Sequence, residues 1–314
     1  MNRRNVLKVV ASAFSGAGLL GMGVNPARAE GRKSGTMKSK SSSTPLIETR
    51  DGVGLFYRDW GKGRPVVFAA PWAMGSDWWE YQMVFLASQG LRCIAFDRRG
   101  HGRSDEPSGG YDFNTFADDL NSVIERFDLH QTTLVGQSMG CGEVVRYLSR
   151  HGAARVERIV LIGTVTPFLL KTEDNPDGMD ASYFERVRHA LCSDRPNAIA
   201  GYAPVFFGAP KNAVSSEMMR WFTDMILRCS LRVMLDVQHA FSETDFRSDL
   251  RAVAVPTLVI HGDNDAGTPF EITGRKTAAL ISGSQLTVYE GAAHGLNITH
   301  AEHLNQDLLA FIRR

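Results

Sequence analysis

Ser138 stands in the pattern Gly-x-Ser-x-Gly, which spans Gly136 to Gly140. Residues 131–135 before it form a short β-branched and apolar run typical of a buried strand, and residues 141–151 after it favour a helix. A serine between a strand and a helix is what a nucleophile elbow requires. The turn exposes the hydroxyl, and the helix N-terminus faces the negative charge that develops beside it. The pattern therefore predicts Ser138 as a catalytic nucleophile.

A serine nucleophile needs a base, and the base needs an acid that orients it. In chains with such an elbow the order is serine, acid, histidine. His294 follows the last apolar strand in a loop of small residues, and Asp263 and Asp265 follow the apolar run 257–261. Asp265 is favoured over Asp263 because it lies further past the strand end and can turn back towards His294. The alternative is that Asp263 is the acid. If Asp265 is the acid, Asp263 structures the loop.

Stabilising the oxyanion of an acyl-transfer reaction takes two backbone N–H groups. Met139, directly after the serine, supplies one. The other comes from the loop after the apolar run 65–69, where Pro71 has no N–H and Trp72 is the favoured donor.

Several aromatic residues in the middle of the chain are expected to line an apolar acyl pocket together with Trp72. These are Tyr202, Phe206, Phe207 and Trp221. The alternative for each is a place in the core of the helical segment that contains it.

Strand and helix patterns alternate from residue 45 onward, which predicts an α/β fold with a mostly parallel sheet and helices on both faces. Asp51-Gly52 predicts an opening hairpin that makes the sheet mixed. Thr115 and Asp118 predict a capping box at the start of a helix over residues 114–127. Residues 166–246 break the alternation with three or four helices, which we expect to form a cap above the site within a domain spanning residues 45–314.

The N-terminus resembles an export signal. Arg3 and Arg4 precede a mildly apolar run, and Ala27-Arg28-Ala29 provides a cleavage pattern. Residues 1–29 are therefore predicted to be a twin-arginine-type signal peptide that directs the protein to the periplasm or outside the cell. A membrane anchor is the alternative, but an apolar run of sixteen residues is short for a span of about 20. Residues 30–44 are predicted to be a disordered tether.

The charge balance excludes two classes of partner. The 314 residues carry a net charge of +1; without residues 1–29, which hold four of the 35 basic residues and no acidic ones, it is −3. We therefore expect neither nucleic acid nor an anionic membrane surface as a partner. No Cys/His grouping has metal-ligand spacing, so no metal site is predicted. Hydrolysis by a serine nucleophile requires no cofactor, and none is expected. A bridge between Cys192 and Cys229 is left open.

The chain resembles the α/β-hydrolase superfamily and, over residues 45–314, its cofactor-free haloperoxidase and arylesterase group. The resemblance rests on motifs spread along the chain: residues 79–83, 97–102, 111–113, 118–120, 136–140, 175–178, 206–208, 294–295 and 305–311. It implies Ser138, Asp265 and His294 as the triad, with Trp72 and Met139 as oxyanion donors. Two departures stand in the oxyanion loop. Ala70-Pro71 replaces the family's His-Gly, and Ala73 replaces a proline associated with peracid formation.

The hypothesis is a serine hydrolase that cleaves small carboxylic esters or lactones, with peracid formation as a side activity when hydrogen peroxide replaces water. One alternative uses the same triad on a C–C or amide bond. Another is a non-catalytic ligand-binding protein on the same fold. The oligomeric state is not predicted.

Overall fold

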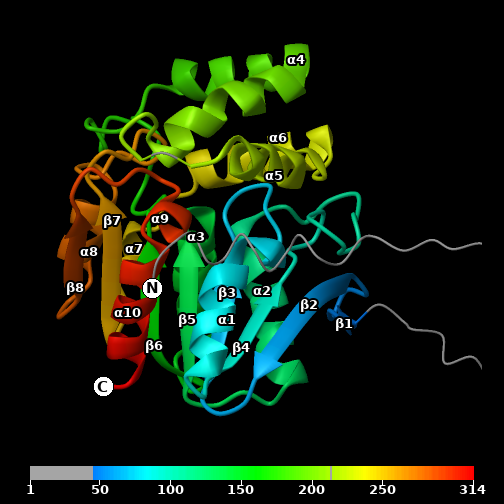
Figure 1. Ribbon diagram of the computed structural model, residues 1–314, viewed down its shortest axis with the longest axis vertical. Coiled ribbons are helices and arrows are strands. Elements are labelled where there is room, and N and C mark those ends of the chain that lie inside the picture. The colour runs from blue at the N-terminus through cyan, green and yellow to red at the C-terminus, as the bar shows by residue number, and fades with distance from the viewer. Residues whose placement is uncertain (1–44, 213) are drawn as a thin grey trace, which may run out of the picture. The chain divides into compact units, whose positions relative to one another are not determined.

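The computed structural model describes residues 45–212 and 214–314, which form one compact unit (Figure 1). Eight strands make one sheet in the order β1-β2-β4-β3-β5-β6-β7-β8. The strands are β1 (Leu46–Glu48), β2 (Gly54–Gly61), β3 (Pro65–Ala69), β4 (Arg92–Phe96), β5 (Thr132–Gln137), β6 (Val156–Ile162), β7 (Thr257–Gly262) and β8 (Gln285–Tyr289).

The opening hairpin is antiparallel and the rest of the sheet is parallel. β1 pairs antiparallel with β2, and β2 with β4, whereas all other neighbours run parallel. β5 and β7 are buried along their whole length, because helices cover both faces of the sheet. The predicted mixed, mostly parallel sheet is thus confirmed.

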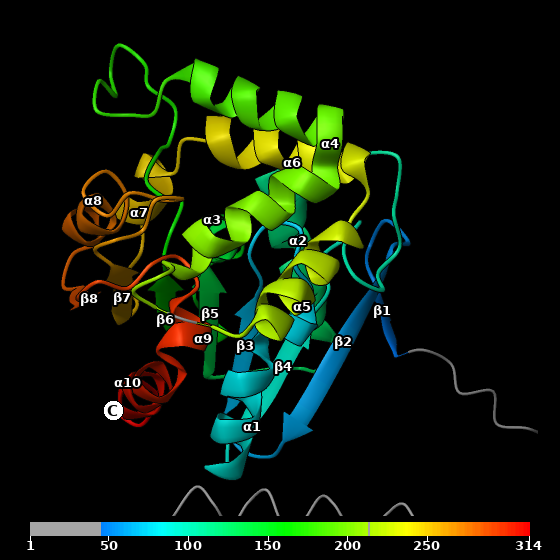
Figure 2. The same cartoon turned by 45° about the horizontal axis from the view of Figure 1, so that its top comes forward.

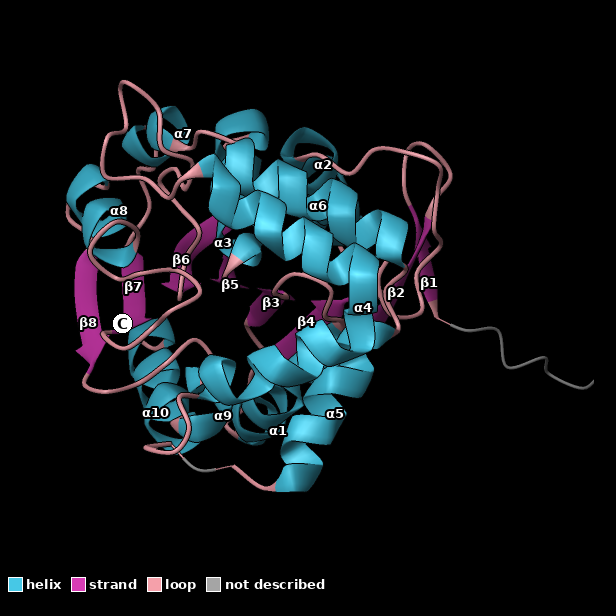
Figure 3. Cartoon of the chain, turned by 90° about the horizontal axis from the view of Figure 1, so that it is seen from above, coloured by secondary structure: helices cyan, strands magenta, loops and turns pink. Residues whose placement is uncertain are grey.

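Helices flank the sheet on two sides. Seen from above, α1, α9 and α10 lie on one face, and α2, α3 and α8 lie on the other (Figure 3). Their bounds are α1 (Glu80–Ser88), preceded by the 3-10 helix η1 (Ser76–Trp79), α2 (Phe113–Arg126), α3 (Met139–His151), α8 (Gly274–Leu280), α9 (Leu296–Thr299) and α10 (Ala301–Ile312).

The start of α2 differs from the prediction. Asp112, rather than a Thr115/Asp118 box, is the N-cap residue, and its carboxylate accepts hydrogen bonds from the amides of Asn114 and Thr115. Thr115 donates its hydroxyl to the same carboxylate at 2.9 Å. The capping-box prediction was wrong because an aspartate three residues earlier satisfies the first free amides of the helix.

Four further helices lie between β6 and β7: α4 (Ala181–Phe207), α5 (Ser216–Leu227), α6 (Leu231–Glu243) and α7 (Arg247–Arg251). α4 is kinked at Asp194, whose φ of −155° and ψ of 81° are not helical. α4, α5 and α6 lie over the carboxyl ends of the strands (Figures 1 and 2). We call α4, α5 and α6 the cap.

Four cysteines lie in the described residues, and all are free thiols, so Cys192 and Cys229 form no bridge in this structure. Across residues 45–212 and 214–314, no helix combines the length and the apolar character needed to cross a membrane. The predicted signal peptide and tether lie outside the described residues.

Candidate active site

Ser138 occupies the turn between β5 and α3 with a φ of 57° and a ψ of −121°. Non-glycine residues rarely adopt this conformation, and it is characteristic of a nucleophile elbow. The turn needs the glycines on both sides. A Cβ on Gly136 would come within 2.5 Å of the Gly140 carbonyl oxygen, and a Cβ on Gly140 within 2.3 Å of the Ala69 carbonyl oxygen.

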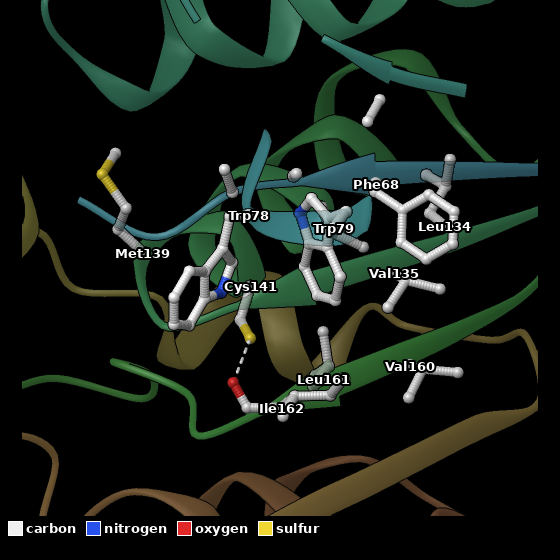
Figure 4. Close-up of a cluster of buried hydrophobic side chains, with 14 of the residues drawn as sticks. Phe68, Trp78, Trp79, Leu134, Val135, Met139, Cys141, Val160, Leu161 and Ile162 are labelled. Carbon is white, nitrogen blue, oxygen red and sulfur yellow. Dashed lines mark hydrogen bonds between the residues drawn. The ribbon is translucent and has the colours of Figure 1, made fainter. Parts of the chain in front are cut away.

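Backbone hydrogen bonds fix the elbow to β6. The amide of Ser138 donates to the Ile162 carbonyl at 2.9 Å, and the Ser138 carbonyl accepts from the amide of Cys141 at 3.1 Å. The Cys141 thiol donates to the Gly136 carbonyl. It also donates to the Ile162 carbonyl, as Figure 4 shows. Burial raises the pKa of Cys141 to about 12, so this thiol is a neutral donor that supports the turn.

The structure brings Asp265, from the loop after β7, to His294, from the loop after β8. His294 Nδ1 lies 2.6 Å from Asp265 Oδ2. Asp263 has a different role, because its Oδ1 accepts from the amide of Gly291 at 2.5 Å and thereby holds the start of the His294 loop. Asp265, and not Asp263, is therefore the aspartate in contact with His294.

Asp265 is held as a carboxylate by several donors. Its Oδ1 accepts from the amides of Gly267 and Thr268, both at 2.9 Å, and its Oδ2 also accepts from the Thr268 hydroxyl at 3.0 Å. Burial by itself raises the pKa of Asp265. The charge of protonated His294 and hydrogen bonds from His261 and His294 outweigh burial and hold that pKa well below its ordinary value. An ionised Asp265 orients the imidazole and stabilises its charged form.

Sequence reasoning missed Thr268 and His261. His261 Nε2 donates to the Thr268 carbonyl at 2.8 Å and lies 3.5 Å from Asp265 Oδ2. Thr268 stands three residues after Asp265, a spacing at which an aspartate often accepts from the backbone. That spacing was the signal available in the sequence.

Gln137 links the elbow to the His294 loop, and this residue was also missed. Its Oε1 accepts from the indole N–H of Trp78 at 2.6 Å, and its Nε2 donates to the His294 carbonyl at 2.9 Å. Trp78 thus orients an amide that fixes the backbone of His294 relative to Ser138. The identity of Gln137 is not constrained by the Gly-x-Ser-x-Gly pattern, so the pattern gave no sign of this role.

Ser138 and His294 line the same cavity, which has a volume of about 270 Å³. Because His294 Nδ1 contacts Asp265, the other ring nitrogen, Nε2, is the one available to a serine hydroxyl or a substrate. Among the described residues no hydrogen bond joins the two side chains directly, and such contacts often form only when substrate is bound.

The two predicted oxyanion donors come from different elements: Met139 begins α3, and Trp72 lies in the loop after β3. Met139 is the first residue of α3, where an amide has no partner within the helix. Trp72 follows β3 and lines the cavity, and its indole N–H donates to the Met234 carbonyl of α6 at 3.0 Å. Ala73 after it has a φ of 59°, so the loop turns sharply at that point.

A buried ion pair connects the Trp72 loop with α3. Arg98 Nη2 donates to the Ala70 carbonyl at 2.8 Å and to Glu143 Oε2 at 2.5 Å. Burial raises the pKa of Glu143, and the charge and hydrogen bonds of Arg98 oppose that rise. Arg98 therefore ties the loop that carries one proposed oxyanion donor to the helix that begins with the other.

The predicted pocket residues separate into two pairs. Tyr202 and Phe206 line the cavity, and the Phe206 ring lies edge-on to His294 with centroids 5.3 Å apart. Phe207 does not line it; it is fully buried against Phe222 in the cap core. Trp221 does not line it either and stacks on Trp78 with centroids 5.9 Å apart. The core alternative therefore holds for Phe207, whereas Trp221 is half-buried and packs on Trp78 outside the cavity.

Burial raises the pKa of Tyr202, whose hydroxyl lies beside the Asp265 loop. A Cβ on Gly267 would come within 2.5 Å of that hydroxyl. Most of the remaining cavity wall comes from apolar residues of the cap and of loops near it: Met74, Val165, Leu169, Phe184, Val187, Ala190, Leu191, Ala198, Ile199, Phe222, Ile226 and Phe241.

Comparison with known proteins identifies the family. A model of the alpha/beta hydrolase fold matches residues 64–225, and one described as TAP-like protein matches residues 219–314. The non-heme chloroperoxidase CPO-A1 of Kitasatospora aureofaciens is 41% identical over 274 residues, which cover 86% of this chain and 100% of that protein. The chain belongs to the α/β-hydrolase fold family.

This α/β hydrolase falls within one functional group of the family. The bifunctional esterase/perhydrolase DCH of Acinetobacter calcoaceticus is 39% identical, over 85% of this chain and 99% of its own. The crystal structure of a bromoperoxidase from Bacillus anthracis superimposes with a TM-score of 0.82 at 39% identity, over 86% of this chain and 99% of that one. The chain is thus an enzyme of the cofactor-free haloperoxidase, esterase and perhydrolase group, which confirms the predicted family.

Proposed function

We propose that this α/β hydrolase cleaves small carboxylic esters or lactones through an acyl-serine intermediate, with Ser138, His294 and Asp265 as its triad. The observation that carries the proposal is the 2.6 Å contact between His294 and Asp265, on a histidine that lines the same cavity as Ser138. Acyl transfer requires a nucleophile, a base oriented by an acid, and space for the acyl group. These correspond to the serine on its strained turn, the histidine held by a buried carboxylate, and the apolar cavity.

The reaction follows from these positions. His294 Nε2 takes the proton of Ser138 as the Oγ attacks the acyl carbonyl, and Asp265 stabilises the resulting imidazolium. The amides of Trp72 and Met139 donate to the oxyanion, and His294 returns the proton to the leaving alcohol. Water activated by His294 then attacks the acyl-serine and releases the acid.

Perhydrolysis is a second candidate, favoured by a relative described as a bifunctional esterase/perhydrolase. If hydrogen peroxide attacks the acyl-serine in place of water, the carboxylic product is a peracid, and serine is regenerated in the same way. A peracid can transfer oxygen to a halide ion after release from the site. Ala73 stands where the family has a proline associated with peracid formation. We therefore expect water to be the better second substrate of this chain.

Replacement of the nucleophile tests the proposal. Ser138→Ala should lower kcat for p-nitrophenyl acetate by about 10⁴-fold or more, because the hydroxyl that forms the intermediate is gone. Substantial remaining turnover would show that another residue carries the chemistry. The folded state of the variant is checked by circular dichroism.

Labelling with a fluorophosphonate separates the enzyme from a ligand-binding protein on the same fold. The wild-type chain should be labelled at Ser138 and the Ser138→Ala variant should remain unlabelled. A panel of esters, lactones, amides and β-diketones under one assay then distinguishes ester cleavage from amide or C–C cleavage by the same triad.

We also propose export by the twin-arginine route, with cleavage after Ala29. The support is the arginine pair Arg3-Arg4 and the Ala27-Arg28-Ala29 pattern. Replacement of both arginines by lysine should retain the full-length chain in the cytoplasm, whereas unchanged appearance of a shortened chain in the periplasm would contradict this route.

A further inference from the structure

The mostly apolar cavity has a polar side chain on its cap side. Gln238 of α6 is 1% exposed and lines the cavity that Ser138 and His294 also line. Its Oε1 accepts a hydrogen bond from Nη1 of Arg188, on α4, at 2.6 Å. Two helices of the cap therefore hold this amide in one orientation.

The pairing with Arg188 fixes which end of the amide is free. A guanidinium group only donates, so the oxygen of Gln238 must face it and the NH₂ group must turn the other way. Within residues 45–212 and 214–314, no acceptor pairs with Gln238 Nε2. Because Gln238 lines the cavity, its Nε2 is a donor that an acceptor on a bound substrate can meet.

The position of Gln238 places that donor near the proposed oxyanion loop. Met234, one turn earlier on α6, accepts the indole N–H of Trp72 through its carbonyl at 3.0 Å. Phe241, almost one turn later, packs edge-on against the Trp72 ring with centroids 6.1 Å apart. Gln238 thus lies on the side of α6 that faces Trp72, and an acyl group bound beside Trp72 comes next to the amide.

We propose that Gln238 Nε2 is a substrate-binding donor, which selects esters or lactones that carry an uncharged acceptor oxygen a few bonds from the scissile carbonyl. An ether, hydroxyl or ketone oxygen fits this donor. A carboxylate does not, because one neutral amide cannot compensate for moving a full charge into an apolar cavity. This inference rests on the proposed ester or lactone hydrolysis and specifies its substrate class.

The test uses esters that differ by one atom. p-Nitrophenyl pentanoate is compared with p-nitrophenyl ethoxyacetate and p-nitrophenyl 3-methoxypropanoate, in which an ether oxygen replaces a different methylene group of the same chain. For each ether, kcat/KM is divided by kcat/KM for the pentanoate, and this selectivity ratio is compared between the wild type and Gln238→Met. The comparison between proteins cancels the intrinsic reactivity of each ester.

In Gln238→Met the selectivity ratio should fall about tenfold for at least one ether, because one hydrogen bond to the substrate is lost. Gln238→Glu keeps the pairing with Arg188 and replaces the donor by an acceptor, so it should show the same loss. Ratios that stay within about twofold of the wild type for both ethers in both variants would overturn the inference.

Phe241→Leu is the matched control, because it changes an apolar lining residue of the same helix. It should alter turnover of the ether and hydrocarbon esters together and leave their ratio unchanged; a tenfold change in its ratio would also count against Gln238. Absence of Ser138-dependent turnover of the pentanoate by the wild type would instead mean that the proposed function itself fails.

Discussion

The loops at the carboxyl edge of the sheet and the cap above them hold their side chains by different means. Asp265 receives hydrogen bonds from two amides, the Thr268 hydroxyl and His294, so its position is fixed at four points. The cap contributes mainly apolar side chains, such as Leu191 and Phe206, to the cavity wall. Directional bonds position the proposed chemistry, and apolar packing shapes the substrate space. Substitutions in the two regions should therefore affect different kinetic constants.

The largest effect is expected at the acid of the triad. Asp265→Asn should lower kcat for p-nitrophenyl acetate by about 10³–10⁴-fold, because an amide can hold His294 in the wrong tautomer and cannot stabilise its charge. Asp263→Asn is the matched control, since an asparagine oxygen can still accept from the Gly291 amide. It should keep kcat near the wild-type value. Equal losses in the two variants would contradict the assignment.

A smaller loss is expected at the link between the elbow and the His294 loop. Gln137→Met removes the bonds to Trp78 and to the His294 carbonyl, so His294 loses its fixed distance from Ser138. We expect kcat to fall by up to about 10²-fold with little change in KM, because misplacement of a catalytic group by about 1 Å costs that much.

Gln137→Glu separates the two bonds. It keeps an acceptor for Trp78 and loses the donor for the His294 carbonyl, so its kcat should also fall. Steady-state kinetics and thermal unfolding of both variants distinguish a positioning role from a loss of stability. If kcat falls only in proportion to the fraction of folded protein, Gln137 has no positioning role in catalysis.

In the cap we expect a change of preference with the chemistry left intact. Leu191→Ala enlarges the cavity, so the ratio of kcat/KM for p-nitrophenyl octanoate to that for the acetate should rise about tenfold. Val205→Ala, at an exposed position of the same helix, is the control and should leave this ratio unchanged. A large fall in kcat for the acetate in Leu191→Ala would contradict the view that the cap sets substrate preference and leaves the chemistry to the loops.

The smallest effect concerns pH and stability. The pKa of Asp265 lies below its ordinary value of 3.8 in the folded protein, so the unfolded chain binds the proton more tightly. The stabilisation from ionised Asp265 is therefore complete above about pH 4 and is lost as the pH falls through the lower, folded-state pKa. Urea unfolding of the wild type and Asp265→Asn from pH 5 downward should show their difference in stability shrinking with acid. A difference that grows below pH 4 would contradict the low pKa.

The sheet and the elbow could be predicted because their signals are local. Apolar runs such as residues 65–69 and 257–261 form strands only when both faces are covered, and Gly136 and Gly140 mark a turn that admits no Cβ. The order of serine, acid and histidine along the chain then led to the pair Asp265 and His294, whose contact the structure contains.

The side chains around the triad could not be predicted, because their roles depend on contacts distant in sequence. Gln137 reaches the His294 loop 157 residues away, and no local pattern indicates that bond. In the cap, Phe206 and Phe207 are neighbours on one helix, yet one lines the cavity and the other lies in the core. Both side chains are phenylalanine rings, so the sequence does not distinguish them. The packing of α4 against α5 determines which ring faces the cavity.

The central claim is that Ser138 carries the acyl group during turnover. Rapid acid quenching of the enzyme with p-nitrophenyl acetate, followed by mass spectrometry of its peptides, tests this directly. We expect an acetyl group on the peptide that contains Ser138, formed as fast as the first p-nitrophenol is released and absent in His294→Ala. Turnover with no acetyl group at Ser138, or with the label on another residue, would contradict it.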